Sequence, residues 1–220
     1  MNSTRGRLTK DGIRIYEPKD FVCMAKAGHV AATILDEIAP HIFVGQTTGE
    51  IDRIITGMVI AHGAKSATIG YKGYQHASCI SVNHVVCHGI PADKRIKEGD
   101  ILNIDVTVIL DGWFGDTSRM YVAGKLARRS ERLIQVTHDA LFKGISAVKP
   151  GNTFGDIGNA IQTYVEEHRM SVVKDFCGHG LGQVFHAPPN VLHYGRPGTC
   201  LLYTSDAADE GLGVDLGGRR

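Results

Sequence analysis

The chain has 220 residues, of which 43% are hydrophobic and 21% charged, and its formal net charge at pH 7 is +1. A chain of this length can bury a sizeable core, as one domain or two small ones. The near-neutral charge balance gives no electrostatic reason to expect nucleic acid or an anionic membrane as a partner, and no apolar run is long enough for a membrane span. The five cysteines are odd in number and lack CxxC spacing, which favours a reduced, cytoplasmic setting.

Residues 1–16 are polar and are expected to form a mobile leader. A helix is predicted from Pro18, since proline is tolerated at a first helical position, to Pro40, which ends it. The period of three and four residues predicts an apolar stripe of Phe21, Met24, Gly28, Ala31, Leu35 and Ile38.

A capping box at Thr47 and Glu50 predicts a second helix, which Gly63 ends. Its inner side is predicted to carry Ile51, Ile54, Ile55, Met58 and Val59. Short strands are expected over residues 67–69 and 79–87, followed by a loop over residues 88–91.

The stretch 103–124 consists of two β-branched runs joined by Asp111-Gly112, the pair that a two-residue type I′ hairpin turn requires. This turn fixes the register of the two strands. It pairs, moving outward, Leu110 with Trp113, Thr107 with Asp116 and Asp105 with Ser118. The face of the sheet opposite Asp105 and Asp116 is predicted to be core and carries Ile104, Val106, Val108 and Leu110.

In this register Asp105 and Asp116 are diagonal neighbours on one face, roughly 7–8 Å apart at the backbone. One interpretation is a solvated polar face. The other is a bound metal ion, because buried anions are costly unless they are paired or hold a cation, and like charges repel. The rest of the chain favours the metal.

The helical pattern then begins again, with a predicted stripe of Leu133, Val136, Ala140, Leu141, Ile145 and Val148. Residues 151–157 repeat residues 45–51 at an offset of 106, and Thr153 with Asp156 repeats the capping box. Chance similarity is the alternative, but the matched helices favour two related halves around a pseudo-two-fold axis.

Two histidines follow in the second half. Glycines on both sides of His179 allow a ligand or ion to approach its imidazole closely, and His186 precedes two prolines. Two carboxylates with an imidazole suit Mn, Fe, Co or Zn better than Mg.

The strings LNIDVTVILDGWFGDTSRMYVAG, SVNHVVCHGIP and FCGHGLGQVFHAPPNVLHY resemble the type I methionine aminopeptidases. The likeness covers roughly residues 8–199. It implies an α/β (α+β) pita-bread fold of two pseudo-symmetric halves, with a curved, mostly antiparallel sheet backed by helices and a dinuclear metal centre in its concave face.

The resemblance also assigns residues. Metal ligands would be Asp105, Asp116 and His179, holding two divalent ions whose identity (Co, Mn, Fe or Zn) stays open. His88 and His186 would contact the substrate near the scissile peptide, and His186 would stabilise the oxyanion. The methionine side chain would lie against Tyr71, Tyr74 and Cys79, while Thr68 stands where a cysteine is common in the family.

The implied activity is removal of the initiator methionine from nascent proteins with a small second residue, by attack of a metal-bound hydroxide. The implied setting is the cytoplasm, with the ribosome exit region as a further partner and a monomeric enzyme. The alternatives are a non-catalytic pita-bread module that holds peptides and a proline-specific metallopeptidase of the same fold.

The sequence departs from the family after Thr199. Members carry two further metal-ligating glutamates there, whereas residues 200–220, beginning CLLYTSDAADE, resemble translated sequencing-adapter DNA, and the surroundings of Glu210 match nothing in the family. We therefore expect a leader (1–16), an incomplete aminopeptidase domain (17–199) and a non-native tail (200–220). With three protein ligands for two ions, this chain is expected to be inactive.

Overall fold

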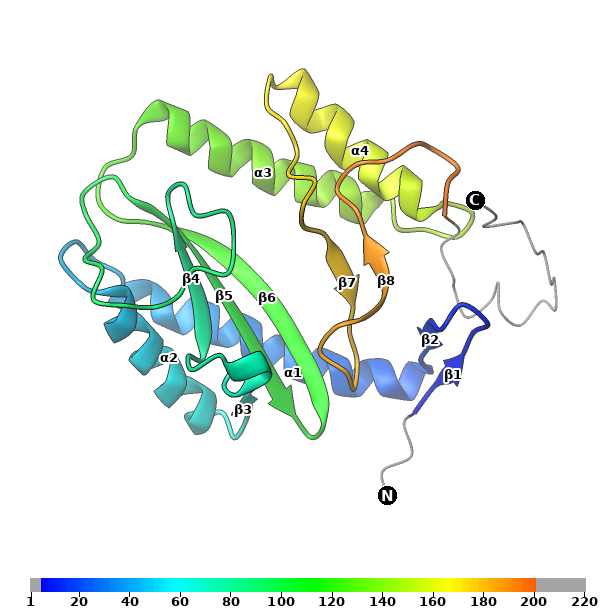
Figure 1. The fold of residues 1–220 in the computed structure, drawn as a ribbon, viewed down its shortest axis with the longest axis horizontal. Coiled ribbons are helices and arrows are strands. Elements are labelled where there is room, and N and C mark those ends of the chain that lie inside the picture. The colour runs from blue at the N-terminus through cyan, green and yellow to red at the C-terminus, as the bar shows by residue number, and fades with distance from the viewer. Residues whose placement is uncertain (1–4, 201–220) are drawn as a thin grey trace. The chain divides into compact units, whose positions relative to one another are not determined.

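The computed structural model describes residues 5–200, and Figure 1 shows their path. The chain divides into two compact units. The first, here called the hairpin unit, comprises Pro18–Glu131 and Leu181–Phe185, and the second, the histidine unit, comprises the remaining described residues. The helices are α1 (Pro18–Ile38), α2 (Thr48–Ala61), α3 (Arg128–Ser146) and α4 (Phe154–Glu167), with short 3-10 helices η1 (Ala39–His41) and η2 (Tyr71–Gly73). The strands are β1 (Arg7–Leu8), β2 (Arg14–Ile15), β3 (Lys65–Ser66), β4 (Ser78–Val82), β5 (Ile101–Leu110), β6 (Trp113–Val122), β7 (Gly178–Gly180) and β8 (Ala187–Val191).

The hairpin unit is built around strand β5. It pairs with β6 along one edge and with β3 and β4 along the other, and every pairing is antiparallel. Helices α1 and α2 cover one face of this sheet (Figure 1). That face carries Leu102, Ile104, Val106 and Val108, all fully buried. Each such side chain contributes about 1.5–3 kcal/mol to folding, so this face is the main source of stability in the unit.

Helix α1 begins at Pro18 as predicted, and Ala31, Leu35 and Ile38 of its predicted stripe are buried, but the N-terminal half of that stripe is not. Phe21 is 53% exposed, while Ala27 and Ile34 are fully buried. The reason is the close approach of β6, where a Cβ added to Gly115 would lie 2.3 Å from the backbone carbonyl of Ala27. Small residues of α1 therefore face β6, and a prediction based on large apolar side chains does not identify them.

Helix α2 confirms the capping prediction. Thr47 accepts a hydrogen bond from the Glu50 backbone N–H, and the Glu50 carboxylate accepts one from the Thr47 backbone. The strand predictions beside it were less accurate. The strand expected over residues 67–69 lies at Lys65–Ser66, and the one expected over 79–87 ends at Val82, where a turn closed by Val85 N–H begins.

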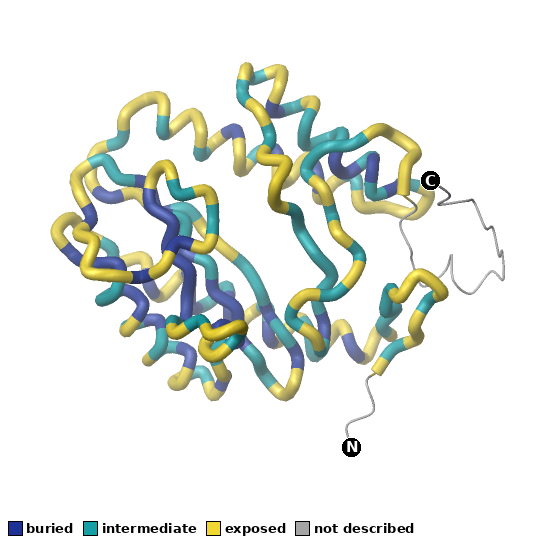
Figure 2. The backbone as a smooth tube through the Cα atoms, in the orientation of Figure 1, coloured by how far each residue is buried: buried dark blue, intermediate teal, exposed yellow. Residues whose placement is uncertain are grey.

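The histidine unit contains α4, most of α3 and the ladder of β7 with β8. Gly144 of α3 lies against Ile161 of α4, since an added Cβ there would be 2.8 Å from the Ile161 side chain. Within the expected leader, β1 pairs with β2. Figure 2 shows that the buried backbone is concentrated in the hairpin unit, whereas much of α3 is exposed.

The predicted repeat extends to the backbone hydrogen bonds at the start of α2 and α4. Gly49 N–H donates to Ala92 O, and Gly155 N–H donates to Thr199 O. One residue earlier, Thr48 N–H donates to Lys94 O, and Phe154 N–H donates to Cys200 O. Both halves therefore fold a returning segment onto the first turn of a capped helix. Cys200 still takes part in this pattern, and the rest of the expected non-native tail lies outside the described residues.

Candidate metal centre

The predicted hairpin register is confirmed. Thr107 pairs with Asp116, Asp105 pairs with Ser118, and the turn residues Asp111 and Gly112 have φ of 50° and 80°, as a type I′ turn requires. Asp105 and Asp116 therefore lie on one face of the sheet, opposite the helices.

The carboxyls of Asp105 and Asp116 are close enough to interact with each other. Burial, the charge of Asp116 and a hydrogen bond between the two carboxyls together raise the pKa of Asp105 to about 7, and burial has the largest effect. Thr107, itself buried, donates a hydrogen bond of 3.0 Å to Asp116 Oδ1 and so fixes the orientation of that side chain. At neutral pH the pair is stabilised either by a shared proton or by a cation in its place, so the two carboxylates fit a divalent metal ion.

Two of the three predicted pocket residues lie beside this pair. Cys79 on β4 pairs directly with Asp105 across the ladder. The Tyr74 hydroxyl and the Cys79 thiol share a hydrogen bond, and burial raises the pKa of both groups. A neutral phenol and a neutral thiol therefore form a wall next to the carboxylates.

Tyr71, the third predicted pocket residue, belongs to an aromatic cluster that the sequence analysis missed. Its ring centroid is 4.9 Å from that of Phe185, which in turn stacks on Phe114 at 5.6 Å. The segment carrying Phe185 is fixed to β6 by a hydrogen bond from Phe114 N–H to Gly182 O. The signal available in the sequence was the Val-Phe pair directly before His186.

A second residue missed by the sequence analysis is Cys87, whose pKa is raised by burial and by the charge of Asp105. It precedes His88, which is exposed and has φ of 55°. The next residue, Gly89, runs against β4, accepting a hydrogen bond from Ile80 N–H and donating one to Ser81 Oγ. The His88 loop is thus fixed to the same strand that carries Cys79.

His179 and His186 lie in the histidine unit, where their ring centroids are 4.3 Å apart. His179 Nδ1 is 3.0 Å from Gly180 O. Because a carbonyl oxygen only accepts, Nδ1 carries the proton and Nε2 has the lone pair that metal ligation needs.

Across residues 5–200, no three His, Cys, Asp or Glu side chains are grouped so as to hold a metal ion. Asp105 and Asp116 belong to the hairpin unit and His179 to the histidine unit. The pair of aspartates is an observed feature, and its completion by His179 stays a prediction.

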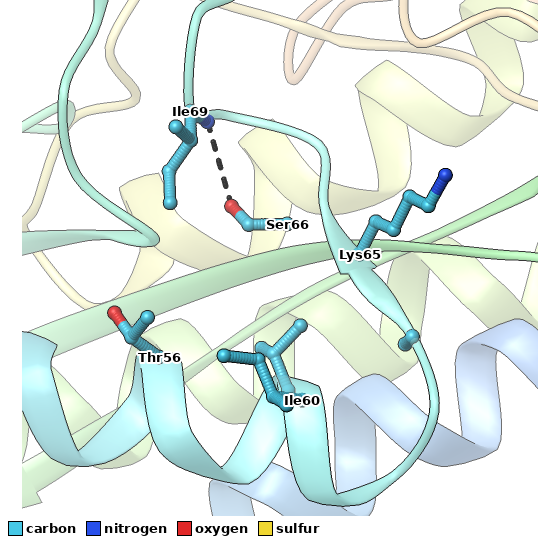
Figure 3. Close-up of a pocket in the computed structure, with 7 residues that line it drawn as sticks. Thr56, Ile60, Lys65, Ser66 and Ile69 are labelled. Carbon is cyan, nitrogen blue, oxygen red and sulfur yellow. Dashed lines mark hydrogen bonds between the residues drawn. The ribbon is translucent and has the colours of Figure 1, made fainter.

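A hollow of about 290 Å³ lies beside α2 in the hairpin unit (Figure 3). Its lining, Thr56, Val59, Ile60, Ala64, Lys65, Ser66 and Ile69, includes none of the predicted site residues. The hydrogen bond from Ile69 N–H to Ser66 Oγ closes one side. The hollow is therefore separate from the candidate metal centre.

Comparison with known proteins agrees with the fold. Residues 22–207 match metallopeptidase family M24, and the chain belongs to that family. Its relatives include the methionine aminopeptidases of Rickettsia prowazekii, 54% identical over 86% of this chain and 73% of that protein, and of Escherichia coli K12, 49% identical over 83% and 70%. The crystal structure of the Rickettsia prowazekii methionine aminopeptidase superposes with a TM-score of 0.86 at 53% identity, covering 87% of this chain and 77% of that one.

Within family M24 the chain therefore groups with the methionine aminopeptidases, and its fold is the pita-bread fold of that group. All strand pairings in the described residues are antiparallel, as the resemblance implied. In residues 5–200 no helix has both the length and the apolar character that crossing a membrane requires.

Proposed function

We propose that this chain is built to remove the N-terminal methionine from nascent proteins whose second residue is small, with divalent metal ions as cofactors. The observation that supports this most directly is the coupled pair of Asp105 and Asp116 beside the wall of Tyr74 and Cys79. The anionic pair suits a metal cation, and the neutral, largely apolar wall beside it suits an uncharged thioether side chain.

Each residue has a proposed role. Asp105, Asp116 and His179 would hold the ions, which when bound supply Lewis acidity and an activated water. Asp116 is oriented for this by the Thr107 hydroxyl, and His179 presents Nε2 because Nδ1 faces Gly180 O. Tyr71 and the wall of Tyr74 and Cys79 would contact the methionine side chain, and His88 and His186 would contact the peptide near the scissile bond.

The experiment that tests the ion site is Asp105→Asn. Turnover of Met-Ala-Ser with added Mn is expected to be abolished in a chain continued past Thr199 with the C-terminal segment of a relative, while the fold is retained. Asp111→Asn is the matched control, because it makes the same chemical change in the same hairpin at the exposed turn, where asparagine tolerates a positive φ. Near-normal turnover by Asp105→Asn would refute the ligand assignment. Cleavage of Xaa-Pro peptides in preference to Met-Ala-Ser would identify a proline-specific enzyme instead.

His186 is proposed to contact the substrate and to donate to the developing oxyanion rather than to ligate metal. His186→Ala is expected to lower kcat by about 10²–10³, the size of one lost transition-state donor. Mn affinity measured by calorimetry is expected to stay nearly constant. A large loss of Mn affinity would make His186 a ligand.

Three protein ligands are few for two ions, so we propose that the 220-residue chain itself binds them weakly and has no measurable turnover. Calorimetry with Mn and a Met-Ala-Ser assay with Mn or Co test this, and the continued chain described above is expected to restore both readouts. Robust turnover by the 220-residue chain would show that further ligands are dispensable.

The proposed setting is the reducing cytoplasm, near the ribosome exit region, with the enzyme acting as a monomer. All five cysteines are free thiols, which fits a reducing compartment. Sedimentation of the purified chain tests the monomer, and a dimer would contradict it.

A further inference from the structure

Asp52 is a buried carboxylate that the proposed reaction does not use. It lies on α2 and is only 6% exposed. Its Oδ1 accepts three hydrogen bonds, from Ala77 N–H at 3.0 Å, Ser78 N–H at 2.9 Å and Ser78 Oγ at 2.8 Å. Ala77 and Ser78 are themselves fully buried, so these donors depend on Asp52 rather than on water.

The segment that Asp52 holds is fastened at further points. Asp52 Oδ2 is 3.1 Å from His76 Nδ1, and Thr68 Oγ1 donates to His76 O at 2.7 Å. The Tyr74 hydroxyl donates to Ser78 O at 2.9 Å. One carboxylate therefore fixes the backbone of residues 76–78 from the helix side of the sheet.

This segment connects the two side chains of the proposed pocket wall. Tyr74 precedes it, and Cys79, which pairs with Asp105, follows it directly. The hydrogen bond between the Tyr74 hydroxyl and the Cys79 thiol closes the loop over the anchored backbone. Any shift of residues 76–78 would move both wall residues relative to the aspartates.

We propose that Asp52 is a positioning residue that sets the shape of the methionine pocket by anchoring the backbone between Tyr74 and Cys79. The identity of the pocket rests on the proposed function, whereas the anchoring rests only on the contacts described above. Asp52 touches neither the proposed ions nor the substrate. Its effect passes through an acceptor atom, Oδ1, and not through its negative charge.

The test measures how fast iodoacetamide alkylates Cys79 in the full 220-residue chain, with mass spectrometry to separate the cysteines. Cys79 is 9% exposed, so its rate reports opening of the wall, and Cys23 on α1 is the internal reference. Asp52→Ala removes all three hydrogen bonds and is expected to raise the Cys79 rate at least about tenfold, because the loss of even one such bond shifts a local opening equilibrium by about that factor. Asp52→Asn keeps the Oδ1 acceptor and is expected to change the rate less than about threefold.

Glu37→Ala is the matched control. Glu37 Oε2 lies 2.9 Å from His62 Nε2, so this change also removes a carboxylate–imidazole pair, here between α1 and the C-terminal end of α2, but one without a link to the wall. Ser78→Ala removes one of the three donors and is expected to give a smaller rise. If Asp52→Ala fails to fold, Ser78→Ala becomes the deciding variant. An unchanged Cys79 alkylation rate in Ser78→Ala would then overturn the proposal.

An unchanged Cys79 alkylation rate in Asp52→Ala would also overturn the proposal. So would an equal rise in the Cys23 rate, which would mean that the whole fold is loosened. An equal rise of the Cys79 rate in Asp52→Asn would overturn it too, because it would mean that only the charge of Asp52 matters. Protection of Cys79 by L-methionine, with L-alanine as control, is measured in the same assay. It is expected in the unaltered chain and lost in Asp52→Ala. Absence of protection in the unaltered chain would refute the pocket assignment, while the alkylation rates would still decide the role of Asp52.

Discussion

The two halves of the repeat use the same local devices but bury very different amounts of apolar surface. On α1, Ala31, Ile34, Leu35 and Ile38 are at most 1% exposed. On α3, Val136 and Ala140 of the predicted stripe are buried, but Leu133, Leu141 and Ile145 are 45–55% exposed. Helix α1 packs against β5 and β6, and the described residues provide no such hairpin for α3. An amphipathic pattern thus predicts a helix, while the strand hairpin decides how much of that helix becomes core.

The largest expected contrast is between equivalent truncations in the two halves. Ile104→Ala in β5 is expected to lower the free energy of unfolding by about 3–4 kcal/mol, because it leaves a cavity in a fully buried core. Ile145→Ala on α3 is expected to cost less than about 1 kcal/mol, because Ile145 is half exposed. Urea unfolding measures both, and equal losses would show that Ile145 on α3 is packed as tightly as Ile104 in β5.

A stabilising effect is expected at the aspartate pair of the metal-free chain. The folded-state pKa of Asp105, about 7, is above its unfolded value of 3.8, so its contribution to stability falls as pH rises from about 4 to about 7. Asp105→Asn removes this loss and is expected to stabilise the chain by about 2 kcal/mol at pH 7.5 and hardly at all at pH 4. Thermal unfolding in EDTA at both pH values tests this, and destabilisation at pH 7.5 would contradict it.

A matched pair of glycines compares the two capped helices. A Cβ on Gly155 would lie 2.1 Å from Arg196 O, while a Cβ on Gly49 would lie 3.2 Å from Ala92 O. Gly155→Ala is therefore expected to lower the free energy of unfolding by about 1–3 kcal/mol, and Gly49→Ala by less than about 1 kcal/mol. A larger loss at Gly49 would mean that the returning segment of the first half is the less adaptable of the two.

The smallest effects are expected at the capping carboxylates, where the halves should agree. Hydrogen bonds from Thr153 hold the pKa of Asp156 below its usual range, and those from Thr47 do the same for Glu50. A lowered folded-state pKa gives stability that is present above the unfolded pKa and lost as pH falls through the folded one. Asp156→Asn and Glu50→Gln should each lower the melting temperature slightly at pH 7 and not at pH 3. If one substitution raised the melting temperature and the other lowered it, the two capping boxes would not be equivalent.

The parts of the fold that the sequence predicted are those set by neighbouring residues. The type I′ turn at Asp111-Gly112 fixes a register, and a capping box fixes a helix start, because each is complete within a few residues. The short strands were placed less well, since a strand such as β3 exists only where β5 offers it a partner. The N-terminal half of the inner stripe of α1 was misassigned because Gly115 brings a strand too close for large side chains.

The candidate site divides in the same way. The hairpin alone predicted that Asp105 and Asp116 share one face of the sheet. Cys79 and Tyr74, which the family resemblance assigned to the methionine pocket, lie beside them. Phe185 was missed because its partners Tyr71 and Phe114 are distant in sequence and meet only in the folded chain. The role of Asp52 was hidden for the same reason, since its hydrogen-bond donors lie 25 and 26 residues away.

The turn at Asp111-Gly112 also bears on how the protein ages. An aspartate followed by glycine is the least hindered setting for attack of the next backbone nitrogen on the side-chain carboxyl, the first step of isoaspartate formation. Asp111 is exposed at the tip of the hairpin. Rerouting the chain through its side chain would insert one extra methylene into a two-residue turn and shift the strands that hold Asp105 and Asp116 in register. Slow chemical damage at the surface would thus reach the aspartate pair through the backbone, without any residue of the pair being modified.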